Sequence, residues 1–212
     1  EDPLFAREPV AATNGSRTIG LLPGSRDKEI SRLLPVMLKA ADILTRQDER
    51  LKFLVSVAPA TDPATIQQLV DMQAGAADVE LVEESVDSIF RRSMLVVATS
   101  GTVTLEAALC GIPTVIVYKV SPMTYWLGKM LVRVDFMGLA NLIAGREVVP
   151  ELAQGRASAK NISKTVWQLL SDDDRRLAIQ QDLAMVRETL GGPGASKRAA
   201  QIALKMIEAN EP

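Results

Sequence analysis

Residues 18–26 have the sequence Thr-Ile-Gly-Leu-Leu-Pro-Gly-Ser-Arg, in which a short apolar run ends in a Pro-Gly turn. The run is typical of a buried strand, and the apolar stripe from Ile30 to Leu44 that follows it is typical of a helix. A strand, a tight turn and a helix together form the repeating unit of a parallel α/β sheet. Pro35 interrupts the stripe, so we expect a kink or the start of a second helix there.

The alternation of strand and helix patterns continues as far as Val120. It predicts further strands at 53–57, 79–82, 94–98 and 114–118, and helices that begin at Asp62-Pro63 and at Thr102. After Tyr118 the pattern changes: 138–150 resembles a loop, and polar-faced helices are predicted at 158–170, 174–190 and 196–209. The sequence therefore predicts the α/β class, as a Rossmann-like parallel sheet flanked by helices with additional C-terminal helices.

Composition excludes several classes of protein. The 212 residues include 24 basic and 26 acidic side chains, a net charge of −2 that argues against a dedicated binder of duplex nucleic acid. With no histidine, a Ser-His-Asp triad, a Cys-His pair and a His-ligated zinc site are impossible within this chain. The single Cys110 rules out a disulfide framework and is expected in the core. Any chemistry must therefore use carboxylates, Arg, Lys, hydroxyls or backbone dipoles.

The first candidate site is the turn Gly24-Ser25-Arg26 at the carboxyl end of the first strand. Open α/β sheets bind ligands at such ends, backbone N–H groups at a helix start suit an anion, and Arg26 adds a fork for phosphate. The alternative is an ordinary strand-to-helix turn with a solvated Arg26.

The second candidate site is the strand-to-helix junction Ser100-Gly101-Thr102. Gly101 permits close approach of the backbone, and the positive end of the helix favours a phosphate. Glu106 lies one turn further along the same face, where its carboxylate can accept hydrogen bonds from a ribose diol. The alternative is a Ser or Thr N-cap with a Glu that interacts with the helix dipole.

Three other segments allow two interpretations each. Residues 122–134 suit an interfacial helix, although a core or dimer contact is favoured. Residues 191–194, Gly-Gly-Pro-Gly, follow a helix rather than a strand, which favours a loop between helices over a phosphate cradle. Asp172-Asp173-Asp174 are predicted to start a helix rather than to hold a metal, because adjacent carboxylates diverge on a helix.

Four stretches in the same order resemble the lipid-A-disaccharide synthase family. They are Leu21-Leu22-Pro23-Gly24-Ser25-Arg26, residues 98–108 with Ser100-Gly101-Thr102 and Leu105-Glu106, residues 117–122 from Val117-Tyr118, and residues 141–152 from Asn141-Leu142-Ile143-Ala144-Gly145-Arg146-Glu147. The resemblance covers about residues 19–190.

The resemblance implies one half of a glycosyltransferase B fold and an inverting hexosyltransferase. Such an enzyme transfers 2,3-diacylglucosamine from its UDP conjugate to 2,3-diacylglucosamine 1-phosphate, makes lipid A disaccharide 1-phosphate and releases UDP. It needs no cofactor and no metal. It works in the cytoplasm as a peripheral protein of the inner membrane of Gram-negative bacteria. The resemblance is also compatible with a homodimer.

The resemblance also implies roles for individual residues and segments. Arg26, with Ser100-Gly101-Thr102, would hold the diphosphate and stabilise the leaving group, and Gly24 and Ser25 would bind the substrate. Glu106 would bind the ribose, Asn141, Arg146 and Glu147 would line the donor cleft, and Tyr118 would bind the substrate.

For the domains, the family implies a linker at 1–16 from an N-terminal half outside this chain, a nucleotide-sugar-binding domain at 17–155 and helices at 156–212 that pack on or cross between domains. That other half would supply the general base, so we expect this chain alone to be inactive. Two alternatives stay open: another UDP-sugar glycosyltransferase or epimerase of the same fold, and a non-catalytic nucleotide-binding module.

Overall fold

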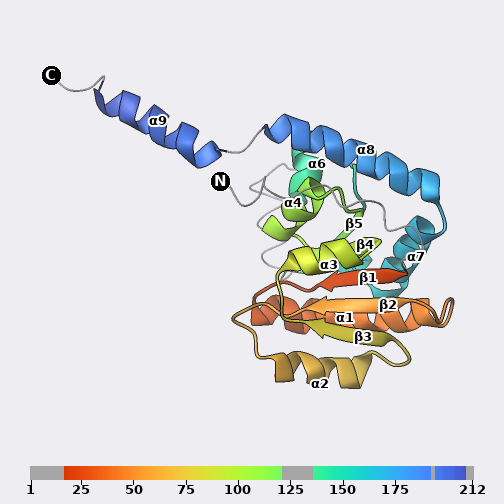
Figure 1. Cartoon of the computed structure of the whole chain (residues 1–212). Helices are drawn as coiled ribbons and strands as arrows, with labels where there is room; N and C mark the ends of the chain where they lie inside the picture. Colours follow the sequence, from red (N-terminus) through yellow and green to blue (C-terminus); the bar gives the residue numbers. More distant parts are fainter. Residues whose placement is uncertain (1–16, 121–135, 192–193, 209–212) are drawn as a thin grey trace.

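The computed structural model describes residues 17–120, 136–191 and 194–208. A six-stranded sheet in the order β3-β2-β1-β4-β5-β6 runs through it, and all neighbouring strands are parallel (Figure 1). The strands are β1 (Thr18–Leu22), β2 (Lys52–Ser56), β3 (Asp78–Val82), β4 (Leu95–Thr99), β5 (Thr114–Tyr118) and β6 (Glu151–Ala153). The predicted Rossmann-like sheet is confirmed.

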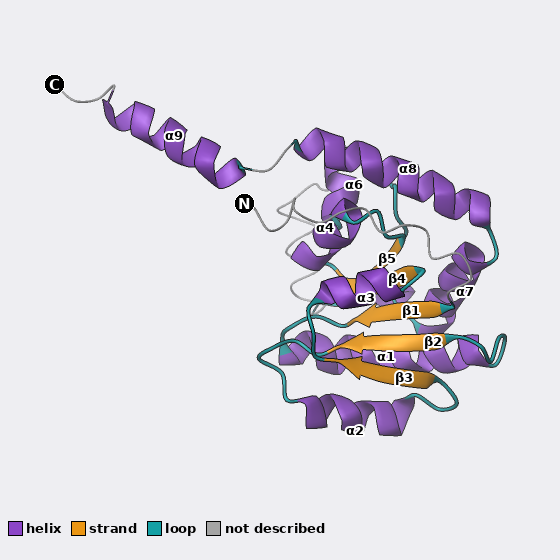
Figure 2. Ribbon diagram, viewed as in Figure 1, coloured by secondary structure: helices purple, strands orange, loops and turns teal. Residues whose placement is uncertain are grey.

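Helices cover both faces of this sheet (Figure 2). They are α1 (Asp27–Thr45), α2 (Pro63–Gln73), α3 (Val86–Arg92), α4 (Thr102–Leu109), α6 (Leu139–Ala144), α7 (Ala159–Leu170), α8 (Asp173–Leu190) and α9 (Ala195–Glu208), with a 3-10 turn η1 (Gln154–Arg156). α7 packs against α1, and α8 packs against α4 and α6. In Figure 1, α9 extends away from the rest of the chain.

Alternate side chains of each central strand enter two different cores. In β4, Leu95 and Val97 join the core shared with α1 and α7, whereas Val96 and Ala98 join the core shared with α3 and α4. This follows from the two-residue period of a strand, which sends neighbouring side chains to opposite faces. Both faces are apolar, as expected for a parallel sheet covered on each side by helices.

Most predicted elements are confirmed with small shifts at their ends. β1 and β5 have the predicted bounds, and Asp62 caps α2 because its carboxylate accepts the N–H of Ala64 at 3.1 Å. The three predicted C-terminal helices are α7, α8 and α9, and Gly191 and Gly194 lie between the last two. Cys110 is buried in the core, as predicted.

The structure corrects the sequence predictions at three places. Pro35 does not start a second helix: α1 is one helix that contains it, since buried leucines and Met37 on both sides hold the helix against the sheet. The stretch 138–150, predicted as a loop, contains α6, and the predicted strands omitted β6, which is only three residues long.

Some predictions concern residues outside those described. The linker at 1–16 and the segment 122–134 lie there, as do Gly192 and Pro193. Among the helices of the described ranges, none is both long enough and apolar enough to cross a membrane.

Candidate functional site

The two candidate turns lie side by side at the carboxyl ends of two central strands, β1 and β4. β1 and β4 pair directly, with Leu22 opposite Ala98, so the turns that follow them leave the same edge. The strand order reverses between β1 and β4, and in open α/β sheets ligands bind at this switch point, beyond the carboxyl ends of the strands.

A cleft of about 720 Å³ opens at this place, and we call it the β1/β4 cleft. All seven residues predicted from the two turns line it: Gly24, Ser25, Arg26, Ser100, Gly101, Thr102 and Glu106. Sequence positions some 75 residues apart thus share one site, as their positions after two strands of a parallel sheet require.

The first turn needs glycine at position 24. Gly24 has φ of +108°, and a Cβ there would lie 2.6 Å from Oε2 of Glu29 and 3.1 Å from Cγ2 of Thr99. Arg26 is the N-cap residue of α1 in an extended conformation, and its guanidinium pairs with Glu29 at 2.7 Å while its side chain is 80% exposed. A guanidinium has five N–H donors, so this pair leaves Arg26 with donors for a bound anion.

The second turn is anchored on its side and open at its tip. The Ser100 hydroxyl donates to the carbonyl of Met137 at 2.8 Å, and the Ser100 N–H donates to the carbonyl of Val117 at 3.2 Å. The N-cap residue of α4 is Gly101 and has no capping side chain, so the alternative of a Ser or Thr N-cap is wrong here. Apart from Gly101 itself and its two chain neighbours, no atom of the described residues lies within 4 Å of the place where a Cβ of Gly101 would be. Since the first N–H groups of a helix have no partner within it, the start of α4 offers donors to an anion.

Sequence reasoning missed the other half of the cleft lining. Glu29, residues 56–59 at and after the end of β2, and residues 83–86 after β3 also line it. Their signal was available, because each of these loops follows the carboxyl end of a predicted strand. Glu83 and Glu84 follow the edge strand β3, so negative charge gathers at the end of the cleft away from α4.

Comparison with known proteins identifies the family. Residues 2–206 match the family described as Lipid-A-disaccharide synthetase. The chain belongs to this family. The lipid-A-disaccharide synthase of Syntrophus aciditrophicus (strain SB) is 42% identical over 194 residues, 92% of this chain and 50% of that protein. The synthase of Geobacter metallireducens (strain ATCC 53774 / DSM 7210 / GS-15) is 40% identical over 209 residues, 97% of this chain and 54% of that protein. The chain spans about half the length of the curated relatives it matches.

Solved structures share the fold of this lipid-A-disaccharide synthetase family member. A mutant of TarM from S. aureus in complex with Fondaparinux, alpha-GlcNAc-glycerol and UDP has a TM-score of 0.61, with 13% identity, over 95% of this chain and 37% of its own. A UDP-GlcNAc 2-epimerase from Neisseria meningitidis bound to UDP-GlcNAc has a TM-score of 0.58, with 14% identity, over 92% of this chain and 45% of its own. At such low identity the likeness shows the fold alone.

Four residues that the family resemblance assigned to substrate binding are absent from the described lining of the β1/β4 cleft: Tyr118, Asn141, Arg146 and Glu147. Tyr118 ends β5 and is half-buried. The carboxylate of Glu147 accepts the N–H of Glu151 at 3.3 Å.

Asn141 is fully buried, and its amide is engaged on both sides. The oxygen accepts the N–H groups of Val148 and Val149 at 2.7 and 2.9 Å. The nitrogen donates to the carbonyl of Val149 and to Glu151, both at 2.8 Å. Asn141 therefore holds the segment between α6 and β6 in place.

Arg146 forms a two-bond ion pair with Asp182 of α8, at 2.8 and 2.6 Å. The hydrogen bond from Arg146 is the main cause that lowers the pKa of Asp182 below its ordinary 3.8. A depressed folded-state pKa stabilises the protein above the ordinary value, and that stabilisation is lost as the pH falls through the depressed one.

Asp182→Asn is therefore expected to lower the urea midpoint of unfolding at neutral pH, by an amount that shrinks towards zero as the pH falls below about 4. Urea titrations of parent and variant over this pH range measure the difference. Glu188→Gln, which removes an exposed carboxylate from the same helix, is the control. A difference that is unchanged at the lowest pH would show that the ion pair is not its source.

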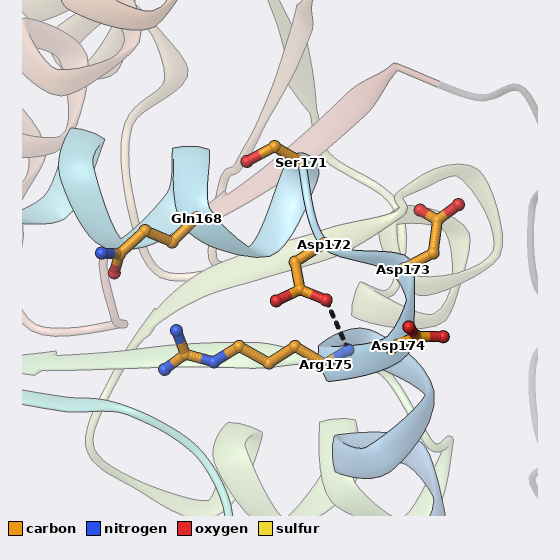
Figure 3. Close-up of a pocket in the computed structure, with 6 residues that line it drawn as sticks. All are labelled: Gln168, Ser171, Asp172, Asp173, Asp174 and Arg175. Carbon is orange, nitrogen blue, oxygen red and sulfur yellow. Dashed lines mark hydrogen bonds between the residues drawn. The ribbon is translucent and has the colours of Figure 1, made fainter.

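The Asp172-Asp173-Asp174 run starts a helix, as predicted. Asp172 is the N-cap residue of α8 and accepts the N–H of Arg175 at 2.9 Å. In Figure 3 the three carboxylates point in different directions around this helix start. Within the described residues, no group of three or more Cys, Asp and Glu side chains is placed to hold a metal ion.

Proposed function

We propose that this chain is the UDP-sugar-binding half of an inverting lipid-A-disaccharide synthase. The complete enzyme transfers 2,3-diacylglucosamine from its UDP conjugate to 2,3-diacylglucosamine 1-phosphate, making lipid A disaccharide 1-phosphate and releasing UDP. The observation that carries the proposal is the β1/β4 cleft, where Arg26 and the open start of α4 meet at the switch point of the sheet. Family membership favours this synthase over the other UDP-sugar enzymes of the same fold.

For the proposed glycosyl transfer, the cleft must stabilise the diphosphate leaving group. As the bond from the sugar to the diphosphate breaks, negative charge grows on the β-phosphate. Arg26 is charged at every physiological pH, and the dipole of α4 is fixed before the reaction, so neither must reorganise when the charge develops. With these donors the diphosphate is held without a metal ion.

The charges of the residues that line the cleft also suggest where the ribose and the base of the nucleotide bind. Glu106, one turn into α4, accepts hydrogen bonds from the ribose hydroxyls. The loops after β2 and β3 then face the uncharged base, because Glu83 and Glu84 repel a phosphate there.

The acceptor and the general base belong to the half of the enzyme outside this chain, so the chain alone is inactive in transfer. The complete enzyme works at the cytoplasmic face of the inner membrane, where its acylated substrates reside.

Calorimetric titration with UDP in the absence of metal tests the proposal. The parent is expected to bind UDP and to bind ADP far more weakly. Glu106→Gln should weaken UDP binding about fivefold, since it replaces a charged acceptor by a neutral one. The same variant should bind 2′,3′-dideoxy-UDP as the parent does, because that ligand lacks the hydroxyls.

Two results would contradict the proposal. One is that full-length protein and this chain both fail to bind UDP. The other is that Glu106→Gln weakens UDP and its dideoxy analogue equally, which would remove Glu106 from the ribose.

A further inference from the structure

We infer that Glu151 is a positioning residue for the anion-binding turn at the start of α4, although it does not line the β1/β4 cleft. This inference rests on the proposed function of that cleft. It is carried by a chain of hydrogen bonds that leads from the Glu151 carboxylate to Ser100.

The first link is the Glu151 carboxylate, which gathers three donors. Its Oε2 accepts the N–H of Met137 at 3.0 Å. Its Oε1 accepts the N–H of Gly138 at 2.9 Å and the amide of Asn141 at 2.8 Å. A carboxylate that accepts backbone N–H groups forms stronger hydrogen bonds than a neutral acceptor, so it fixes the backbone at residues 137–138.

The approach is so close that a side chain at position 138 would displace the tips of two neighbouring side chains. A Cβ on Gly138 would lie 2.8 Å from Oε1 of Glu151 and 2.2 Å from Cδ1 of Ile116. The backbone of Gly138 is therefore clamped between the Glu151 carboxylate and strand β5.

The second link joins this clamped backbone to the cleft. The carbonyl of Met137 accepts the hydroxyl of Ser100, the residue before the N-cap of α4, at 2.8 Å. The N–H of Ser100 donates to Val117, which pairs with Leu152 in β6, next to Glu151. Both hydrogen bonds that hold Ser100 thus end on backbone that Glu151 or its strand positions.

The far end of α4 is fixed separately. Arg187 of α8 donates to the carbonyl of Leu109, the last residue of α4, at 2.5 Å. Loss of the Glu151 clamp should therefore loosen the start of α4 and leave its end in place.

Hydrogen exchange of the ligand-free chain shows whether Glu151 positions the start of α4 or stabilises only its own neighbourhood at residues 136–142. Glu151→Gln puts an amide NH₂ group against a backbone N–H, so exchange is expected to speed up at residues 136–142 and also at 99–106. Ser100→Ala should speed exchange at 99–106 alone, and the double variant should add little there. Glu188→Gln is the charge-removal control. Faster exchange confined to 136–142 would overturn the inference, as would full additivity in the double variant.

UDP binding gives the second readout. Glu151→Gln, Ser100→Ala and the double variant should each bind UDP about fivefold more weakly, the scale of one hydrogen bond, and bind uridine as the parent does. An equal loss for UDP and uridine would overturn the inference. If neither the parent chain nor the full-length protein binds UDP, the proposed function fails while the exchange result still decides the role of Glu151.

Discussion

Replacing Asn141 with alanine is expected to lower the free energy of unfolding by about 3 kcal/mol, because it leaves several buried polar groups without partners. The N–H groups of Val148 and Val149 both lose their acceptor, and Glu151 loses one of its donors. Asn141 itself is fully buried, so the change also leaves a small cavity. Urea unfolding of parent and variant measures the difference.

Asn161→Ala is the matched control. The Asn161 side chain donates one bond near the surface, to the carbonyl of Arg156 at 3.0 Å, so its loss is expected to cost under about 1 kcal/mol. Equal costs for the two variants would show that the segment between α6 and β6 does not depend on Asn141. A variant of unchanged stability that loses UDP affinity would instead place Asn141 in the donor cleft, as the family resemblance implied.

Arg26→Ala is expected to have the largest effect on activity. In the full-length protein it should lower kcat/KM by about 10²- to 10³-fold, because under the proposed function it removes a fixed positive charge from the place where the leaving group becomes negative. UDP binding by this chain should weaken by about tenfold, the scale of a charge-assisted hydrogen bond. Steady-state transfer assays and calorimetry give the two numbers.

The control for Arg26 is Arg32→Ala, further along in the same helix. Arg32 is exposed and does not line the β1/β4 cleft, so its removal should change neither kcat/KM nor the affinity for UDP. A loss shared by both variants would indicate a general effect of charge on α1. A loss confined to KM, with kcat unchanged, would mean that Arg26 binds the substrate without stabilising the leaving group.

The sequence predicts the central strands well because a strand that is buried on both faces of the sheet is a continuous apolar run. β1, β4 and β5 are mainly apolar runs, and those of β1 and β4 are each followed by a turn and a helical pattern. The sequence does not predict β6 and α6, because segments of three and six residues are too short to show the hydrophobic period of a strand or a helix. Pro35 misleads because the burial of its neighbours outweighs one lost hydrogen bond.

The same limits apply to the site. The turns at Gly24 and Gly101 are found from local chemistry, since each places a glycine between the end of a strand and the start of a helix, beside residues that can bind an anion. Asn141 binds backbone groups seven and eight residues away, and Arg146 binds a carboxylate on another helix; no local pattern specifies either partner. The hydrogen bond from Ser100 to Met137 joins residues 37 positions apart, so it depends on the tertiary fold and not on a local pattern.

A crystal structure of this chain with UDP tests the central claim most directly. The account predicts the diphosphate between Arg26 and the N–H groups at the start of α4, the ribose at Glu106 and the base at the loops after β2 and β3. A nucleotide bound elsewhere, or one in the β1/β4 cleft with its diphosphate away from Arg26 and α4, would contradict it.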